Sequence, residues 1–487
     1  MKVSLGAIKT ALVERGLLVN VQGNLPEYAD GISDDSRKLQ DRELFIAVRG
    51  WSNDGHDFLA AAAKRGAAAA IVEDGGRTTL PSLVVREGRQ AAALAAATAY
   101  ANPAHSLRLI GVTGTNGKTT TTSIMRHLFD DGAKSTASIG TLGVLLGSEG
   151  ETLPGGSGLT TPGPVELQRI LRELADRGVR TIAMEVSSHS LDQRRVDGIE
   201  FDVVVFTNLT RDHLDYHGTM ESYLQAKLRL VDYLKRDGTT IVNADAHEWE
   251  GLKSRPRTLT FAVRETADIE ATDVRFTARG SEWRLVTPGG TAETRLPLIG
   301  DVNVENALAA AAAAFALGQS PVSIADRLRS VPQVAGRLEI ISTDPTVLRD
   351  YAHTPDALER TLTTARAFAP GKLIVVFGCG GDRDRGKRPL MGAIAAQGAD
   401  YAIVTSDNPR TEDPDAIIDE IEAGMRGSNH ERVTDRLAAI RRAIDLARGD
   451  DIVVLAGKGH ETYQIRGTTS YPFDEKEIVR DMTVSPT

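Results

Sequence analysis

The sequence predicts an α/β protein in which helices cover mostly parallel sheets. Three observations lead to this expectation: short apolar runs alternate with helical patterns from residue 106 onward, a glycine-rich turn follows one of these runs, and polar loops follow others. Alternation of this kind is typical of strands that are joined through helices. Ligands bind at the carboxyl ends of parallel strands. We therefore expect the functional residues in the loops that follow the apolar runs.

The length of the chain predicts several domains. Its 487 residues exceed what one hydrophobic core normally supports. Polar breaks fall at 102–105 and 331–336. We therefore expect three domains: a smaller N-terminal α/β domain over 1–105, a central P-loop-type domain over 106–335, and a C-terminal Rossmann-like, doubly wound domain over 336–487.

Apolar runs mark the expected strands of the central and C-terminal domains. These runs lie at 107–110, 181–184, 203–206, 239–242, 347–348, 373–377, 401–404 and 452–455. An alternating stretch at 268–298 predicts antiparallel strands, and an alanine-rich stretch at 304–317 predicts a helix.

Composition narrows the possible classes of function. The chain carries 57 Lys and Arg residues against 66 Asp and Glu residues, a formal net charge of −9, with both signs mixed along its length. We see no basic stripe for nucleic acid, and no polybasic tail or run of ~20 apolar residues for membrane insertion. Cys379 is the only cysteine, which excludes an internal disulfide and a thiolate zinc cage. We expect a cytoplasmic protein.

The glycine-rich turn at 111–120 predicts a phosphate-binding loop. It reads Gly-Val-Thr-Gly-Thr-Asn-Gly-Lys-Thr-Thr, between an apolar run and a helical stretch that ends near Phe129. Backbone N–H groups and the positive end of the helix dipole would face one anion, Lys118 would add a charge, and the Thr119 hydroxyl can bind Mg²⁺. The spacing departs from the standard P-loop, because Val112 stands where its first glycine is expected. An ordinary glycine turn would leave Lys-Thr-Thr at the helix start unexplained.

Two neighbouring strand ends carry candidate metal ligands. A site that transfers a phosphoryl group must neutralise charge with metal, so carboxylate or imidazole ligands are expected there. Glu185 follows one apolar run, and His213 follows the next. From the residues alone, Glu185 is also suited to cap a helix, and His213 to make a hydrogen bond in the core.

Lys227 lies in an expected helix over 220–231. Helical spacing places this lysine on an apolar face with Met220, Leu224, Val231 and Leu234. Burial favours the neutral amine, which reacts with CO₂ to give a carbamate whose oxygens can bind a metal. The pattern alone favours the alternative, in which the ammonium group reaches water.

Two C-terminal loops have simple interpretations. Residues 378–381 read Gly-Cys-Gly-Gly, but Arg383 occupies the place of the last glycine of a dinucleotide fingerprint, which argues against one. Cys379 is expected to be a packed small residue, since no base is evident beside it. Residues 407–410 read Asp-Asn-Pro-Arg, which taken alone favours a β-turn.

Taken together, these motifs resemble those of the Mur ligases, the ATP-dependent amide-forming enzymes of peptidoglycan synthesis. The resemblance rests on Lys227 and on the segments 113–120, 185–189, 208–215, 300–306, 336–339, 350–355, 378–384, 407–410 and 457–461. It covers nearly the whole chain. The order and spacing of the segments are most similar to those of the members that add the third residue of the stem peptide.

The resemblance implies roles for individual residues. Those implied to be catalytic are Lys118, Lys227, His213 and His353. Mg²⁺ would be held by Thr119, Glu185, His213 and Lys227 in its carbamate form. ATP would contact Gly114, Thr115, Asn116, Gly117, Lys118, Thr119, Thr120, Asn303, Asn306 and Arg337. The UDP-N-acetylmuramoyl-dipeptide would contact Asp34, Ser36, Trp51, Ser52, Asn53, Leu159, Thr160, Thr161, Ser187, Gln193 and Arg195. The incoming amino acid would contact Arg383, Asp407, Asn408, Pro409, Arg410, Gly457 and Glu461.

The sequence departs from the pattern of the family at a few positions. Leu159 stands where asparagine is frequent, and Ala335 replaces the proline usual before Gly336. The segment at 51–53 also differs from that of some relatives. These departures affect mainly the expected substrate contacts.

The resemblance implies an amide-forming reaction that needs no covalent nucleophile on the enzyme. ATP would phosphorylate the D-glutamyl side-chain carboxylate of UDP-N-acetylmuramoyl-L-alanyl-D-glutamate, and an amine would attack the acyl phosphate. Arg410 predicts meso-diaminopimelate as the amine, because a guanidinium group matches a carboxylate bidentately and L-lysine lacks the distal carboxylate. A monomer is expected. The alternatives are an L-lysine-adding ligase, another Mur ligase, a folylpolyglutamate synthetase-like ligase, and a P-loop ATPase that only switches conformation.

Overall fold

The computed structural model describes residues 1–50, 53–156, 158–277, 280–427 and 429–483. The chain divides into two compact units. Unit 1 comprises 1–270, 286–291 and 305–327, and unit 2 comprises 271–285, 292–304 and 328–487. Both are built from helices and sheets, so the expected α/β class is confirmed. The three-domain division stays a prediction.

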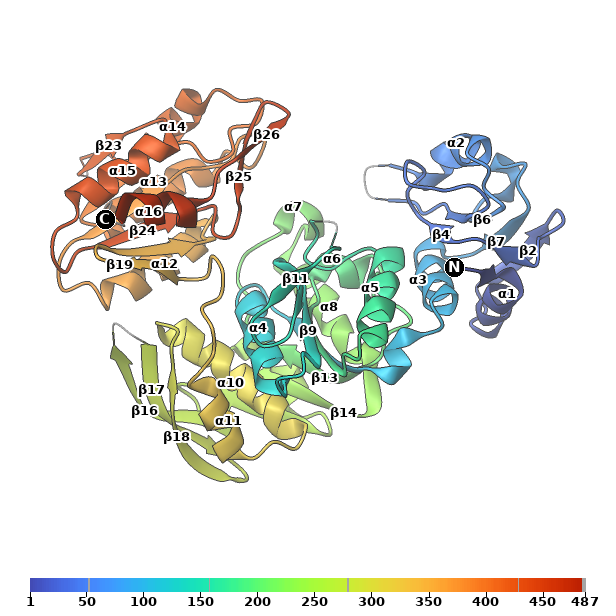
Figure 1. Ribbon diagram of the computed structural model, residues 1–487, viewed down its shortest axis with the longest axis horizontal. Helices are drawn as coiled ribbons and strands as arrows, with labels where there is room; N and C mark the ends of the chain where they lie inside the picture. The colour runs from blue at the N-terminus through green and yellow to red at the C-terminus, as the bar shows by residue number, and fades with distance from the viewer. Residues whose placement is uncertain (51–52, 157, 278–279, 428, 484–487) are drawn as a thin grey trace. The chain divides into compact units, whose positions relative to one another are not determined.

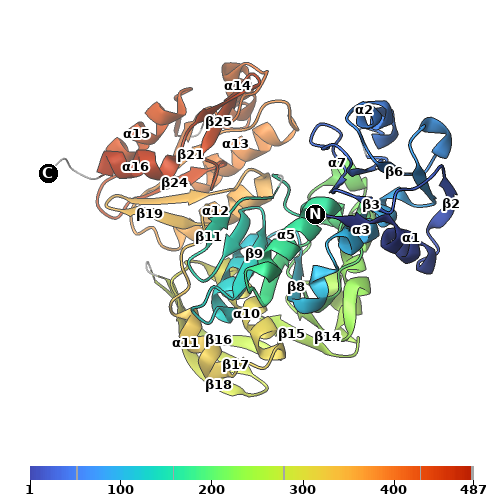
Figure 2. The same ribbon diagram turned by 45° about the vertical axis from the view of Figure 1, so that its right-hand side comes forward.

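The N-terminal part of unit 1 is a sheet with strand order β2-β7-β6-β5-β4. All neighbours in it are parallel except β2 and β7. Helices α1 and α3 cover one face and α2 covers the other (Figure 2). Their apolar side chains belong to two separate core clusters. The elements are β1 (Val3–Ser4), α1 (Leu5–Glu14), β2 (Leu18–Gln22), β3 (Tyr28–Ala29), β4 (Ile32–Ser33), β5 (Leu44–Ile46), α2 (Leu59–Lys64), β6 (Ala69–Val72), β7 (Ser82–Val85) and α3 (Gly88–Ala99).

The central part of unit 1 continues with alternating strands and helices. Its elements are β8 (Arg108–Thr113), α4 (Lys118–Phe129), β9 (Thr136–Gly140), β10 (Gly143–Leu146), β11 (Glu151–Leu153), α5 (Pro164–Asp176), β12 (Thr181–Glu185), α6 (Ser188–Asp192), β13 (Phe201–Phe206), α7 (Leu214–His217), α8 (Met220–Leu228), β14 (Leu234–Asn243), α9 (Glu250–Lys253) and β15 (Thr258–Ala262). Neighbouring strands from β9 through β12, β8, β13 and β14 to β15 are parallel, which confirms the expected mostly parallel sheet.

Strand β8 lies between β12 and β13 in this sheet. Glu185 of β12 is opposite Val112 of β8, and Phe206 of β13 is opposite Thr113. Because the three strands are parallel, their carboxyl ends meet at one edge. The glycine-rich loop at 111–120, Glu185 and the segment after Phe206 are therefore neighbours.

The sheet order continues through β16 (Ile269–Thr277), β17 (Gly280–Thr287) and β18 (Gly290–Leu296). These three are neighbours joined by two residues each, a connection that only antiparallel strands allow. The antiparallel strands expected over 268–298 are therefore present. The alanine-rich helix is α10 (Asp301–Ala316), followed by α11 (Pro321–Leu328).

Unit 2 holds a second sheet with strand order β19-β20-β24-β21-β22-β23. Helices cover both of its faces, with α12, α13 and α14 on one and α15 and α16 on the other (Figure 1). Its elements are β19 (Glu339–Thr343), β20 (Thr346–Asp350), α12 (Pro355–Arg366), β21 (Leu373–Phe377), α13 (Lys387–Gly398), β22 (Tyr401–Val404), α14 (Pro414–Glu422), β23 (His430–Arg432), α15 (Arg436–Leu446), β24 (Ile452–Ala456), β25 (Tyr463–Arg466), β26 (Thr469–Pro472) and α16 (Glu475–Thr483).

The doubly wound arrangement of unit 2 is as expected, but its strand order is not the ordinary Rossmann order. The last long strand, β24, lies between β20 and β21 and is parallel to both. The carboxyl ends of β24, β21 and β22 therefore lie side by side. Among the described residues, no helix is both long enough and apolar enough to span a bilayer.

The apolar face expected around Lys227 is only partly correct. Helix α8 ends at Leu228 and continues as a 3₁₀ segment over 229–233, which rotates the following residues away from regular helical spacing. The buried positions of α8 are Tyr223, Ala226 and Lys227. Met220 is exposed, whereas Lys227 is buried, which the pattern alone did not favour.

Candidate active site

The glycine-rich loop at 111–120, expected to bind phosphate, connects β8 to α4 and depends on two glycines. Gly114 and Gly117 have φ angles of +150° and +85°. A Cβ atom on Gly114 would lie 1.9 Å from the Thr207 hydroxyl oxygen, and one on Gly117 would lie 2.3 Å from Asn306 Oδ1. Neither backbone conformation nor space allows a larger residue at these positions.

The end of β13 holds this loop in place. The backbone N–H groups of Thr115 and Asn116 donate to the backbone and side-chain oxygens of Asn208, each at 2.8 Å. The Thr207 hydroxyl donates to the Asn116 carbonyl oxygen at 2.7 Å. Asn208 and Thr207 had no assigned role in the sequence analysis. Their position directly after β13, beside the end of β8, is the signal that could have identified them.

Two lysines donate hydrogen bonds to the same backbone oxygen. Lys118 Nζ lies 2.9 Å from the Gly114 carbonyl oxygen and 2.8 Å from that of Thr115. Lys227 Nζ lies 2.7 Å from the Gly114 oxygen. Thr119 and Thr120, which follow Lys118 in α4, are both buried.

Lys227 is only 1% exposed. Its Nζ lies 4.5 Å from the centre of the Tyr223 ring. Burial lowers the pKa of Lys227 well below its usual value, and the charge of Lys118 lowers it further. The lysine that reaches water is therefore not the arrangement in this fold. The neutral amine is the form that can react with CO₂.

Glu185 is a buried carboxylate at the end of β12. The backbone N–H of Thr141 donates to Oε1 at 2.9 Å, and the Thr141 hydroxyl donates to Oε2 at 3.2 Å. The side chain does not cap α6, because the side chain of Ser187 accepts from Ser190 N at that position. A carboxylate with these two partners retains lone pairs for a further ligand.

The expected dipeptide-binding residues of the central sheet form a connected group. The Thr161 hydroxyl donates to the Glu185 carbonyl oxygen at 2.9 Å and accepts from Ser187 N at 3.1 Å. Arg195 donates to the Thr161 carbonyl oxygen at 2.9 Å and to Gln193 Oε1 at 2.6 Å. Hydroxyls and a half-buried guanidinium group thus lie beside Glu185.

Two further residues of this expected set border the group. The hydroxyl oxygens of Thr160 and Thr141 are 3.2 Å apart. Leu159 is 43% exposed. Thr141, which bonds to both Glu185 and Thr160, was not identified from the sequence, because a lone threonine after a short strand has no distinguishing pattern.

His213 caps the start of α7 with a left-handed backbone, at φ +52°. Its ring packs edge-on against His189, with centroids 4.8 Å apart, and its Nε2 lies 3.4 Å from Asp212 Oδ2. Burial lowers the pKa of His213. The ring is half exposed, so the alternative of a core hydrogen bond is not observed.

The donor atoms near the loop fit Mg²⁺ in part. Among the described residues, no three histidine, cysteine or acidic side chains gather closely enough to form a metal cage. Mg²⁺ commonly uses one or two carboxylates, several waters and the substrate phosphates, so the Glu185 carboxylate and the Thr119 hydroxyl suit it. The His213 imidazole suits it less well than an oxygen donor.

The N-terminal residues expected to contact the UDP-N-acetylmuramoyl-dipeptide lie in loops of the N-terminal part of unit 1. Asp34 and Ser36 follow β4, and the Asn53 carbonyl oxygen accepts from Gly50 N at 2.9 Å. A Cβ atom on Gly163 would lie 3.6 Å from Asp34 Oδ2, so the loop after β4 borders the segment that carries Thr160 and Thr161. Trp51 and Ser52 lie outside the described residues.

The remaining expected ATP contacts are distributed over other elements. Asn306 is buried in α10 and accepts from the Thr121 hydroxyl at 3.3 Å. Asn303, also buried, donates to the Ile299 carbonyl oxygen at 2.8 Å. In unit 2, the Arg337 guanidinium group lies 4.9 Å from the centre of the Tyr351 ring. His353, which the resemblance implies to be catalytic, is exposed, and its Nδ1 lies 2.8 Å from the Tyr351 carbonyl oxygen.

The expected amino-acid-binding residues of unit 2 come together from three strand ends. Arg383 follows β21, residues 407–410 follow β22, and Gly457 and Glu461 follow β24. Asn408 Nδ2 donates to Glu461 Oε2 at 2.9 Å. A Cβ atom on Gly457 would lie 2.8 Å from Asp407 Oδ2.

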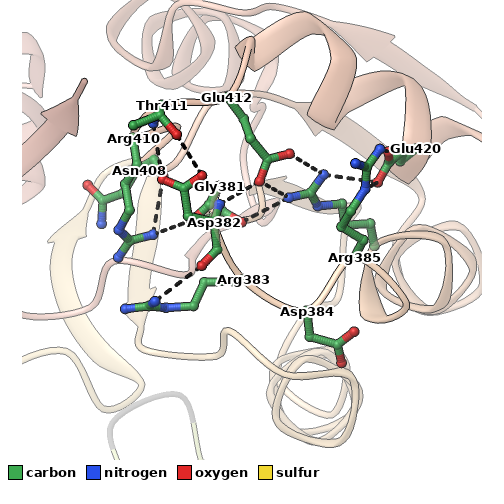
Figure 3. Close-up of polar contacts among 12 residues, drawn as sticks. Gly381, Asp382, Arg383, Asp384, Arg385, Asn408, Arg410, Thr411, Glu412 and Glu420 are labelled. Carbon is green, nitrogen blue, oxygen red and sulfur yellow. Dashed lines mark hydrogen bonds and ion pairs between the residues drawn. The ribbon is translucent and has the colours of Figure 1, made fainter. Parts of the chain in front are cut away.

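Arg410 joins two of these loops (Figure 3). Its guanidinium Nη1 donates to the Gly381 carbonyl oxygen at 2.8 Å, and its backbone N donates to Ile465 of β25. Its backbone is left-handed, at φ +51°. Pro409, just before it, is buried. Residues 407–410 are therefore not an isolated surface turn.

Lys458 was not identified from the sequence. It is fully buried, and its Nζ donates to Asn408 Oδ1 at 3.1 Å and to Glu461 Oε2 at 3.2 Å. These bonds, with that from Ile465 N to Asn408 Oδ1 at 2.9 Å, fix which way the Asn408 amide faces. Cys379 is also buried, and burial raises the pKa of its thiol to about 12, in agreement with a packing role.

Comparisons with known proteins agree with this arrangement. Three family models match the chain: "Mur ligase family, catalytic domain" over 29–107, "Mur ligase middle domain" over 112–314, and "Mur ligase, glutamate ligase domain" over 336–459. The UDP-N-acetylmuramoyl-L-alanyl-D-glutamate--2,6-diaminopimelate ligase of Geobacillus kaustophilus is 45% identical over 459 residues, which are 92% of this chain and 93% of that protein.

Solved structures give the same result. A structure of a UDP-N-acetylmuramoyl-L-alanyl-D-glutamate--2,6-diaminopimelate ligase superimposes with a TM-score of 0.69 at 34% identity, covering 99% of this chain and 98% of that one. A folylpolyglutamate synthase of Mycobacterium tuberculosis, at 17% identity and a TM-score of 0.63, covers 82% of this chain and 96% of its own, and shares the fold alone. This chain belongs to the Mur ligase family.

Proposed function

We propose that this protein is the ATP-dependent ligase that joins meso-2,6-diaminopimelate to UDP-N-acetylmuramoyl-L-alanyl-D-glutamate. The names of relatives at 45% and 34% identity support this reaction. The observation that carries it is the polar set at the ends of β21, β22 and β24. Arg383 and Arg410 can bind a carboxylate, and Glu461 can bind an ammonium group.

In this proposal the loop of unit 1 binds ATP. Backbone N–H groups between Gly114 and Thr120 face the phosphates at the start of α4, and Lys118 leaves the Gly114 and Thr115 carbonyl oxygens to contact the transferring phosphoryl group. The carboxylate of the D-glutamyl side chain attacks the γ-phosphorus and ADP leaves, which gives an acyl phosphate. The amine of diaminopimelate then attacks the acyl carbon and loses a proton, and inorganic phosphate leaves as the amide forms. Thr161, Ser187 and Arg195 hold the dipeptide beside Glu185.

Thr119 and Glu185 would hold one Mg²⁺, and His213 with Lys227 in its carbamate form would hold a second. Bound Mg²⁺ neutralises charge on the phosphoryl oxygens. The buried amine of Lys227 supports the carbamate, because its lowered pKa leaves a nucleophilic lone pair. A carbamate would also place a negative charge beside the positive charge of Lys118.

The choice of amino acid depends on the distal end of the substrate. The guanidinium groups of Arg383 and Arg410 would bind the distal carboxylate of diaminopimelate. Glu461 and Asn408 would bind its ammonium group, with Lys458 holding both in place. L-lysine lacks this carboxylate and would leave the two guanidinium groups without an anionic partner, which predicts discrimination of ~10³-fold.

A panel of amino acids tests this proposal. Purified protein is incubated with ATP, Mg²⁺, the UDP-muramoyl-dipeptide and one amino acid at a time, and the product is identified by mass spectrometry. A UDP-muramoyl-tripeptide should form with meso-diaminopimelate. A product formed only with L-lysine would move the assignment to the lysine-adding type, and no amide product with any amino acid would reject a ligase.

A further inference from the structure

Arg388, in the first turn of α13, is a buried cation that none of the expected contacts uses. Its guanidinium group is 0% exposed. Glu412 binds it bidentately, with Nη1 donating to Oε2 at 2.9 Å and Nη2 donating to Oε1 at 2.8 Å. Glu420 of α14 accepts from Nη1 at 2.9 Å. A buried guanidinium group requires such partners, because an unpaired charge in this position would be strongly destabilising.

Glu412 and Glu420 differ in the other groups that they bind besides Arg388. Glu420 also pairs with Arg385, whose side chain is largely exposed. Glu412 instead accepts a hydrogen bond from the backbone N–H of Asp382, in the loop that follows β21. Arg388 lowers the pKa of Glu412 to about 2, so the carboxylate is charged and binds both partners throughout the neutral range.

Asp382 completes a junction between two loops. Its Oδ1 accepts from the Thr411 hydroxyl at 2.8 Å, and its Oδ2 accepts from the Thr411 backbone N at 3.2 Å. The backbone of Asp382 is left-handed, at φ +54°. The loop after β21 and the loop after β22 are thus joined by side-chain and backbone bonds at adjacent residues.

The two residues of this junction are sequence neighbours of the two arginines of the proposed amino-acid site. Arg383 directly follows Asp382, and Arg410 directly precedes Thr411. In Figure 3 the guanidinium groups of both lie on one side of Asp382, and Glu412 and Glu420 lie on the other. The loops also meet at their backbones, because Gly381 N donates to the Asn408 carbonyl oxygen at 2.9 Å.

We propose that Glu412 is a positioning residue for amino-acid selection: held by Arg388, it fixes Asp382 and Thr411 so that Arg383 and Arg410 bind one terminal carboxylate together. This inference rests on the proposed function. Two guanidinium groups can share one carboxylate only if their spacing is preserved, because its two oxygens accept a limited set of directions. Glu412 itself does not contact the substrate.

Two charge-matched variants separate this role from a purely structural one. Glu412→Gln and Glu420→Gln each remove one anion from Arg388, so both should lower the melting temperature. Only Glu412→Gln also disturbs the contact with Asp382 N. Asp382 N and Arg388 Nη2 share Oε1, and an amide NH₂ in place of Oε2 would face Arg388 Nη1 and displace the side chain that carries the shared oxygen. We expect Glu412→Gln to raise KM for meso-diaminopimelate about tenfold or more, with KM for ATP within about twofold of wild type. Glu420→Gln should leave both constants within about twofold.

Thr411 gives an independent test should Glu412→Gln fail to fold. Thr411→Val, at an exposed position, removes the hydroxyl bond to Asp382 and should raise KM for meso-diaminopimelate severalfold. Thr411→Ser keeps the hydroxyl and should behave as wild type. Equal values of this KM in wild type, Glu412→Gln and Thr411→Val would overturn the inference while the proposed function stands. A wild-type enzyme that does not use meso-diaminopimelate would overturn both.

Discussion

Lys118 and Lys227 meet at one backbone oxygen, the carbonyl of Gly114, with Nζ–O distances of 2.9 Å and 2.7 Å. Two ammonium groups at one acceptor repel each other, and burial adds to this for Lys227. The pair is therefore more stable when Lys227 is neutral. This relationship links the glycine-rich loop at 111–120 to a buried amine far away in the sequence.

Replacing Lys227 should inactivate the enzyme. We expect Lys227→Ala to lose nearly all product formation, with partial recovery when short-chain carboxylates are added, because these can occupy the place of the carbamate. Turnover with and without added acetate measures this. Lys64→Ala, at an exposed lysine at the end of α2, is the matched control and should retain wild-type activity. An active enzyme whose intact mass shows no carbamate would argue against the modification.

Replacing Lys118 should abolish product formation without unfolding the protein. Lys118→Ala deletes the charge that faces the transferring phosphoryl group, and a loss of kcat/KM of about 10³-fold or more is expected from removal of such a contact. Steady-state kinetics measure the loss, and circular dichroism checks the fold. Near-normal turnover at saturating ATP would be incompatible with the proposed ATP site.

Replacing Arg410 should affect one substrate selectively. Arg410→Ala removes a guanidinium group from the proposed amino-acid site, so KM for meso-diaminopimelate should rise by about tenfold or more while KM for ATP changes little. Arg385→Ala is the matched control, because Arg385 pairs with Glu420 and lies outside this site. Similar kinetic constants for the two variants would contradict the assignment of Arg410.

His460 should make the protein less stable in acid. Burial lowers the pKa of His460 to about 4, and the charges of Arg337 and Arg349 lower it further. Since the folded-state pKa is below the unfolded value of about 6.5, the unfolded chain binds the proton first. Stability is therefore full above pH ~6.5 and falls as the pH drops towards 4, by at most about 3 kcal/mol.

Urea denaturation at pH 4.5 and pH 7.5 measures this dependence. His460→Gln should reduce the difference between the two free energies of unfolding, because it removes the titrating ring. His105→Gln, at an exposed histidine, should leave the difference unchanged. An unchanged difference in His460→Gln would show that other groups are responsible.

Much of the fold follows from local patterns. The run at 373–377 coincides with β21, and Phe129 ends α4 as expected. Parallel strands have contiguous apolar runs, and a helix start after a glycine turn has its own signal, so both are visible in the sequence. The strand order of unit 2 is not visible, because nothing in the sequence of β24 indicates that it lies between β20 and β21.

The sequence likewise predicts some residues of the candidate site and not others. Lys118, Glu185 and Arg410 each follow an apolar run, and the strand-end rule therefore predicts them. Lys458 is equally close to a strand end, but its burial depends on β25 and on the loop after β22. The junction of Arg388, Glu412 and Asp382 joins residues 24 to 30 positions apart and depends on which strand ends are neighbours. Such contacts follow only from the assembled sheet.

The dependence of ATP cleavage on both other substrates tests the proposed reaction most directly. ADP release by the purified protein is measured with the UDP-muramoyl-dipeptide and meso-diaminopimelate present together, with each one omitted, and with L-lysine in place of meso-diaminopimelate. We predict that ADP release requires both substrates and that kcat/KM for meso-diaminopimelate exceeds that for L-lysine by ~10³-fold. ADP release that proceeds at the same rate without the dipeptide and the amino acid would contradict a ligase.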